Sequence, residues 1–214
     1  MNASQYYSQM KDLAKAKREE FGIVTAEINI PLIQKIYKSE GVKIDRRKSL
    51  SRKIRAAYFC DGSDCSVLLN SSLPREPKLF SLVHELKHHF VDRDLIENGE
   101  VQCGDYNENE IIEKGAEVFA AEFIFPESEM RELISSMGIS RKNCEAKSIV
   151  DIKRKKVAPV SYMFIKKRFE FLGLIQPGVF DDVKFEKLEE DIYGKPIYKQ
   201  PWFQAKRKKK AALI

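Results

Sequence analysis

The sequence contains no long apolar run. None of its apolar stretches approaches the roughly 20 residues that a membrane-spanning helix requires. The first twenty residues (MNASQYYSQMKDLAKAKREE) also lack an uninterrupted apolar stretch of the secretory type. We therefore expect a cytoplasmic protein with no membrane partner. The chain has 214 residues, 43% of them hydrophobic, which is enough for one globular domain with a core and a small appended subdomain.

Cysteine is scarce, and its spacing does not suggest a metal-binding framework. The four cysteines are Cys60, Cys65, Cys103 and Cys144, and they form no close CxxC pair. Cys60 and Cys65 could pair across a turn. The scattered spacing nevertheless favours reduced, buried thiols in a reducing compartment over disulfides or a structural zinc site.

Most of the chain also lacks a strong net charge. The formal net charge is +6, and five of the excess positive charges lie in the run KRKKK at residues 206–210. The rest of the chain is therefore nearly neutral. This pattern favours a solvated basic tail, and it makes nucleic acid an unlikely partner except through that tail.

Hydrophobic spacing predicts an α+β fold in which helices predominate. Two strand-like runs, RAAYFC at 55–60 and SVLLN at 66–70, flank the turn formers of residues 61–64 and predict a β-hairpin. A short strand is expected at 42–44. Helical periodicity and stop signals predict helices at 3–20, 31–39, 79–92, 110–125, 128–137 and 161–172.

These elements suggest three regions along the chain. We expect a catalytic core over residues 1–140 and a C-terminal helical subdomain over residues 141–176. Residues 177–214 are charged and irregular, which predicts a loosely ordered tail.

A short motif inside the helix predicted at 79–92 indicates metal chemistry. Residues 84–88 read His-Glu-Leu-Lys-His, an HExxH pattern. Two histidines four residues apart on a helix project from the same face, so His84 and His88 can reach one zinc ion. Glu85 can then accept a proton from the attacking water and deliver it to the leaving amine. All three histidines of the chain lie in this helix, and we expect His89 to be a packing or supporting residue.

A catalytic zinc ion takes three protein ligands, and no further histidine remains to supply the third. A carboxylate is therefore expected. Glu113 is the favoured candidate because it shares a helical face with Ala116 and Ala120, whose small side chains permit close packing against the motif helix. Spacing alone leaves open the alternative that Glu113 is a solvated helix charge and not a metal ligand. The other candidates are Asp105, Glu108, Glu110, Glu117 and Glu122.

Two runs of the sequence resemble the ImmA/IrrE metallopeptidases of bacteria, phages and mobile elements. The first is FSLVHELKH at residues 80–88, and the second is Glu113-x-x-Ala-x-x-Phe-Ala-Ala-Glu-Phe-Ile-Phe-Pro at 113–126. Residues 160–175 resemble the C-terminal helical element of that family. Lys87 departs from the family's usual glycine and Glu117 from its usual asparagine, so the shape of the cleft can differ.

The resemblance implies a zincin-like core with a small β-sheet and a C-terminal helical element. It implies Zn²⁺ as cofactor, with His84, His88 and Glu113 as ligands and Glu85 as the catalytic residue. It also implies a protein substrate, expected to be a helix-turn-helix repressor of Xre/Cro type. The alternatives are a toxin or non-enzymatic regulator that binds a repressor or DNA without cutting. Tyr58, Tyr106 or a backbone donor could stabilise the oxyanion.

Overall fold

The computed structural model describes residues 2–48, 50–51, 54–101, 110–195 and 199. The chain divides into two compact units. The first comprises Met1–Leu133 with Lys156–Ser161, and the second comprises Ile134–Lys155 with Tyr162–Ile214. The boundaries expected after residues 140 and 176 stay predictions.

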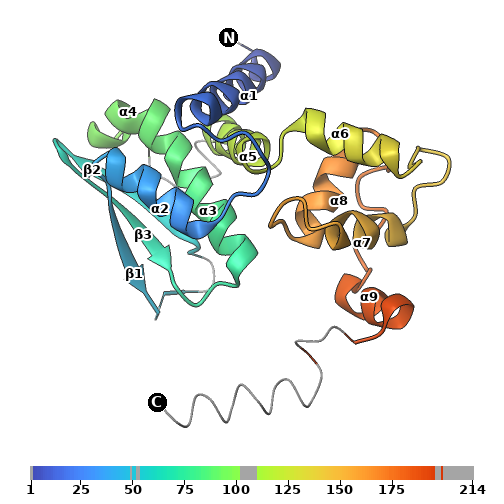
Figure 1. The fold of residues 1–214 in the computed structure, drawn as a ribbon. Coiled ribbons are helices and arrows are strands. Elements are labelled where there is room, and N and C mark those ends of the chain that lie inside the picture. Colours follow the sequence, from blue (N-terminus) through green and yellow to red (C-terminus); the bar gives the residue numbers. More distant parts are fainter. Residues whose placement is uncertain (1, 49, 52–53, 102–109, 196–198, 200–214) are drawn as a thin grey trace, which may run out of the picture. The chain divides into compact units, whose positions relative to one another are not determined.

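The first unit contains a three-stranded sheet with the order β1-β3-β2. Strand β1 (Lys43–Arg47) runs parallel to β3 (Asp64–Asn70), and β2 (Ala56–Asp61) is antiparallel to β3. The predicted hairpin is therefore confirmed, and the strand expected at 42–44 extends further than predicted. Helices α2 (Ile30–Ser39) and α3 (Arg75–Lys87) lie against one face of this sheet (Figure 1). Tyr58 and Val67 are buried, whereas Phe59 is 52% exposed, so the strands alternate between a covered and an open face.

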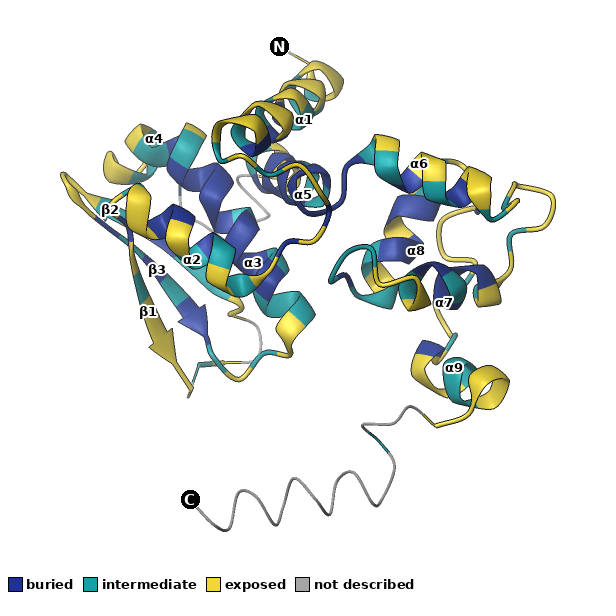
Figure 2. Ribbon diagram, in the orientation of Figure 1, coloured by how far each residue is buried: buried dark blue, intermediate teal, exposed yellow. Residues whose placement is uncertain are grey.

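The first unit also contains four of the predicted helices. Helix α1 (Ala3–Glu20) begins with a capping box in which Asn2 accepts the backbone N–H of Gln5. Helix α2 (Ile30–Ser39) begins at Asn29 and carries proline in its first turn. Helix α5 (Glu110–Ile124) packs between α1 and α3 (Arg75–Lys87), and both α3 and α5 are largely buried (Figure 2).

The helix predicted at 79–92 changes its geometry at the motif. It begins earlier, at Arg75, and α3 ends at Lys87. His88–Asp92 then form a π-helical turn, η1, before the short α4 (Arg93–Glu97). Hydrophobic periodicity is read over several helical turns, so it does not resolve one wide turn of five residues.

The second unit contains α7 (Ala146–Arg154), α8 (Tyr162–Phe171) and α9 (Phe185–Tyr193), while α6 (Glu127–Ser136) spans the boundary between the units. The structure corrects the sequence analysis at α9, which lies in the segment expected to be loosely ordered. Phe185 anchors this helix because its ring is buried and stacks on Tyr162. Helix α7 was not predicted either; Glu145 and Ser148 form a capping box at its start.

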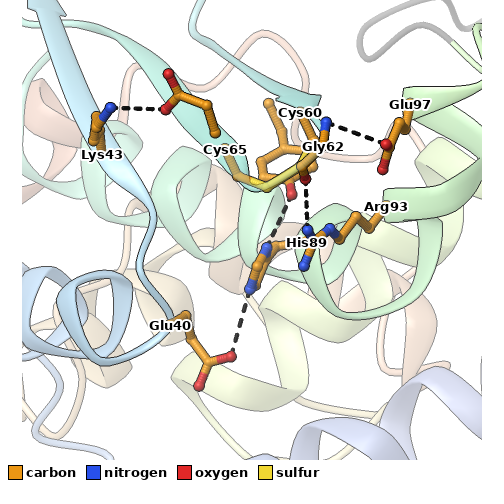
Figure 3. The surroundings of a disulfide bond; sticks show 10 residues. Glu40, Lys43, Cys60, Gly62, Cys65, His89, Arg93 and Glu97 are labelled. Atoms are coloured by element: carbon orange, nitrogen blue, oxygen red, sulfur yellow. Dashed lines mark hydrogen bonds and ion pairs between the residues drawn. A yellow bond between two sulfur atoms is a disulfide. The ribbon is translucent and has the colours of Figure 1, made fainter.

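The structure also corrects the expectation for two of the cysteines. Cys60 and Cys65 form a disulfide bond across the turn between β2 and β3 (Figure 3). The hairpin register is the physical reason, because it places these residues directly opposite each other. Helix α4 also holds this turn. Arg93 donates a hydrogen bond to the carbonyl of Gly62, and Glu97 accepts one from the N–H of Gly62. Cys144 is a free thiol, and Cys103 lies outside the described residues.

Candidate metal centre

The two helices that carry the predicted metal ligands bring them to one point. His84 and His88 come from consecutive turns of α3 and η1, and Glu113 comes from the first turn of α5. Nε2 of His84 lies 3.0 Å from Oε2 of Glu113 and 3.3 Å from Nε2 of His88. Nε2 of His88 lies 3.7 Å from Oε1 of Glu113. One ligand atom from each residue falls within 4.8 Å of the others.

These separations fit a tetrahedral metal ion. Ligand atoms bound at 2.0–2.1 Å in a tetrahedron lie about 3.3 Å apart, and the three separations bracket that value. Glu113 is 1% exposed and His88 is fully buried. Because two buried carboxylates, Glu85 and Glu113, adjoin the histidines, a bound cation would compensate negative charge that water does not reach.

Glu85 occupies the position that the HExxH pattern predicts for a proton acceptor. Its side chain is 4% exposed, and Oε2 is a buried atom without a hydrogen-bond partner among the described residues. Burial raises the pKa of Glu85, against lowering contributions from His84, His88 and a backbone hydrogen bond from Tyr58 in β2. An unpartnered carboxylate oxygen of raised basicity beside a metal cluster is suited to accepting a proton.

The pKa of His84 is raised, whereas burial by itself would lower the pKa of a histidine. Burial alone lowers its pKa, but the hydrogen bond that His84 donates to Glu113 and the charge of Glu85 outweigh burial and leave the pKa raised. The side chains around His84 thus favour positive charge at this point, which is also what a bound dication provides.

The other predicted carboxylates do not join the cluster. Glu110 is exposed, and Glu117 pairs with Lys114 at 2.8 Å. Glu122 is buried and accepts the backbone N–H of Glu127, where it caps the start of α6. Asp105 and Glu108 lie outside the described residues.

One proposed oxyanion stabiliser has another contact in the structure. The hydroxyl of Tyr58 is buried and lies 2.9 Å from Nδ1 of His89. Nε2 of His89 lies 3.4 Å from Glu40, so this imidazole connects β2 to the end of α2 (Figure 3). His89 is therefore a supporting residue, as its place on the helix predicted. Tyr106 lies outside the described residues.

Sequence reasoning missed a third carboxylate, Asp92, at the end of the π-helical turn. Its Oδ2 lies 2.7 Å from Nδ1 of His88 and 2.6 Å from Nζ of Lys87, and all three side chains are buried. The signal available in the sequence was an acidic residue four positions after the second histidine. This spacing places a carboxylate one turn beyond the ligand.

A small sheet, an HExxH helix and a second helix that brings a glutamate to both histidines together define a zincin-like metallopeptidase fold. The comparison with protein families agrees with this class. The family model of the IrrE N-terminal-like domain, Peptidase M78, matches residues 37–170. The match covers more than half of the chain, so the chain belongs to this family of metallopeptidases.

No curated protein matches the chain significantly. Within the part of the chain that the structure describes, no helix is long and apolar enough to span a bilayer.

Proposed function

We propose that the protein is a zinc-dependent endopeptidase in which His84, His88 and Glu113 bind the metal and Glu85 is the general base and acid. The observation that carries the proposal is the convergence of the three ligand residues near Glu85, whose buried Oε2 has no hydrogen-bond partner within the described part of the chain. When bound, zinc would polarise the scissile carbonyl and acidify the attacking water. Glu85 accepts the proton of that water and delivers it to the leaving nitrogen of the peptide.

Strand β2 supports the binding of an extended substrate. It is an edge strand of the described sheet, and Tyr58 in this strand donates a backbone hydrogen bond to Glu85. A peptide that paired with the outer edge of β2 would lie alongside the catalytic residue, as in β-augmentation. The proposed substrate is a helix-turn-helix repressor of Xre/Cro type, which the family resemblance supports.

The alternative of DNA binding through α8 has less support. Of the three cations in this helix, Lys166 and Arg168 are 3% and 6% exposed, and Lys166 pairs with Glu170 and Asp181. Only Lys167 of α8 offers an exposed positive charge. Sequence-independent DNA binding depends on several accessible cations, so this helix is poorly suited to it.

The direct test is incubation of the zinc-loaded protein with the helix-turn-helix repressor encoded beside its gene. Intact-mass spectrometry should show two complementary fragments, and a chelator or the Glu85→Gln variant should prevent their formation. Cleavage that survives both would point to a contaminating protease. A repressor that binds stably but is never cut would instead support the toxin or regulator alternative.

A further inference from the structure

A lysine inside the HExxH motif is buried beside the metal cluster. Lys87 is fully buried, and its Nζ donates to Oδ2 of Asp92 at 2.6 Å and to the carbonyl of Ile112 at 3.2 Å. The ring of Tyr6 from α1 lies 5.4 Å from the same nitrogen. A buried ammonium group is costly unless its donors are engaged. Here a carboxylate, a carbonyl and an aromatic face surround it, drawn from η1, α5 and α1.

The π-helical turn creates the contact between Lys87 and Asp92. In an α-helix, residues five positions apart point about 140° away from each other. In a π-helix the hydrogen bonds join residues five positions apart, so such residues lie nearly one above the other. Because η1 begins directly after Lys87, Asp92 turns back over this lysine and over His88. The wide turn thus brings one carboxylate oxygen to two donors.

Asp92 in turn determines which nitrogen of His88 faces the cluster. A carboxylate only accepts hydrogen bonds, so Nδ1 of His88 must donate to Oδ2 of Asp92. In a neutral imidazole, Nε2 then has no proton. This nitrogen is the one that lies 3.3 Å from Nε2 of His84. Hydrogen-bonded carboxylates of this kind orient metal-binding histidines and typically change metal affinity by about 10–100-fold.

We propose that Lys87 is a positioning residue of the metal centre, acting through Asp92. Lys87 fixes Oδ2 of Asp92, and Asp92 holds the Nδ1 proton of His88, which leaves Nε2 directed at the metal. This inference rests on the proposed function, because it assigns His88 as a ligand. It adds a role for a residue that is neither a ligand nor the general base.

A double-mutant cycle in the full chain tests whether Lys87 acts through Asp92. The variants are Lys87→Met, Asp92→Asn and the combination, and Zn²⁺ affinity is measured by competition with a chromophoric chelator. Lys87→Met and Asp92→Asn are each expected to weaken Zn²⁺ binding by roughly tenfold or more. In the Asp92→Asn background, Lys87→Met should produce almost no further loss.

Lys114→Met is the matched control, because it removes one positive charge from the neighbouring helix α5 without touching Asp92. Lys114 pairs with Glu117 and is 50% exposed. Its replacement should leave Zn²⁺ affinity within about twofold of the parent. An equal loss in Lys114→Met and Lys87→Met would overturn the proposal in favour of a general charge effect. Unchanged affinity in Lys87→Met, or an undiminished loss in the Asp92→Asn background, would also overturn it.

A measurement on the unsubstituted protein covers the case in which Lys87→Met fails to fold. The chain has three histidines, so long-range ¹H–¹⁵N spectra of the metal-free protein contain only a few imidazole signals to assign. His88 should carry its proton on Nδ1, and a proton on Nε2 would overturn the proposal. If the parent bound no Zn²⁺, both the proposed function and this inference would fail. If the parent bound Zn²⁺ and cut its substrate while Lys87→Met matched it, only the role of Lys87 would fail.

Discussion

Glu85 and Glu113 are both buried carboxylates beside the histidines, but their atoms have different contacts. Glu113 lies within 3.0 Å of Nε2 of His84, whereas Oε2 of Glu85 has no hydrogen-bond partner among the described residues. Similar side chains thus occupy different chemical positions. One is placed to bind a cation, and the other is placed to accept a proton.

Replacing Glu85 by glutamine should abolish catalysis without removing the metal. The change deletes the proton acceptor and leaves His84, His88 and Glu113 in place, so turnover should fall by about 10²–10⁴-fold. Peptidase assays give the rate, and atomic absorption after gel filtration gives the metal content. Turnover close to that of the parent would exclude Glu85 as general base.

Replacing Glu113 by glutamine should weaken metal binding, because a neutral amide attracts a dication less than a carboxylate does. Glu110→Gln and Glu117→Gln are the matched controls on the same helix and should have much smaller effects. The measurement is metal content after dialysis against a weak chelator. If Glu113→Gln kept its metal while a control lost it, the ligand assignment would be wrong. Retention in all three would direct attention to Asp105 and Glu108.

The cluster was largely predictable at this scale, and its supporting residues were not. The spacing of His84 and His88 indicates a shared helical face, and the run after Glu113 indicates close helix packing. The small side chains predicted to allow that packing, Ala116 and Ala120, are both fully buried. Asp92 escaped prediction because its contact with Lys87 depends on a π-helical turn that side-chain periodicity does not report.

At the scale of elements, the contact between α1 and α5 depends on one glycine. A Cβ atom at Gly115 would lie 2.5 Å from Cε1 of Tyr6. Tyr6 also contacts the Lys87 ammonium, so this crossing sets how closely α1 approaches the motif helix. Gly115 and Tyr6 both lie in helices that the sequence predicted, but the crossing itself is a tertiary feature that a single sequence does not reveal.

Gly115→Ala should therefore destabilise the protein, although alanine is the better helix former. Overpacking costs about 1–3 kcal/mol, whereas the gain in helix propensity is about 1 kcal/mol. Urea unfolding should show a lower free energy for Gly115→Ala. In a Tyr6→Ala background the steric conflict is gone, so the same substitution should become stabilising. A stabilising effect in both backgrounds would contradict the close approach.

The hairpin disulfide offers a second prediction for a single element. Because Cys60 and Cys65 close a very short loop, a chain-entropy treatment gives about 2 kcal/mol of stabilisation. The Cys60→Ser/Cys65→Ser variant should lose about this amount of unfolding free energy in urea titration. Adding a reductant to the parent should give a similar loss. If alkylation found both thiols free in the untreated protein, the bond would not form in solution.

At the scale of the whole molecule, the residues of the site belong to one unit. His84, Glu85, His88 and Glu113 all lie in the first unit, and so does α1. The family match begins at residue 37, after α1 has ended. Tyr6 and Arg18 of α1 nevertheless contact the helices of the site, since Arg18 donates to the carbonyl of Phe123 at 2.6 Å. The region that supports the centre is therefore broader than the matched region.

A chain that ends after Gln176 should keep its metal while its second unit loosens. Such a chain lacks α9, whose Phe185 stacks on Tyr162. Hydrogen exchange should then be faster in α7 and α8, whereas α3 and α5 should keep their protection and the zinc content should be unchanged. Loss of metal from the shortened chain would show that the second unit supports the centre.

The pairing of Lys87 with Asp92 also constrains how this protein can change over evolutionary time. Losing Asp92 alone strands the buried ammonium of Lys87, at a cost of about 3–5 kcal/mol, whereas Asp92 without Lys87 keeps its contact with His88. That cost is a large share of the 5–15 kcal/mol by which a typical domain is stable. Loss of the aspartate alone should therefore be strongly counter-selected. Among relatives, the lysine is therefore expected only where the aspartate is also present.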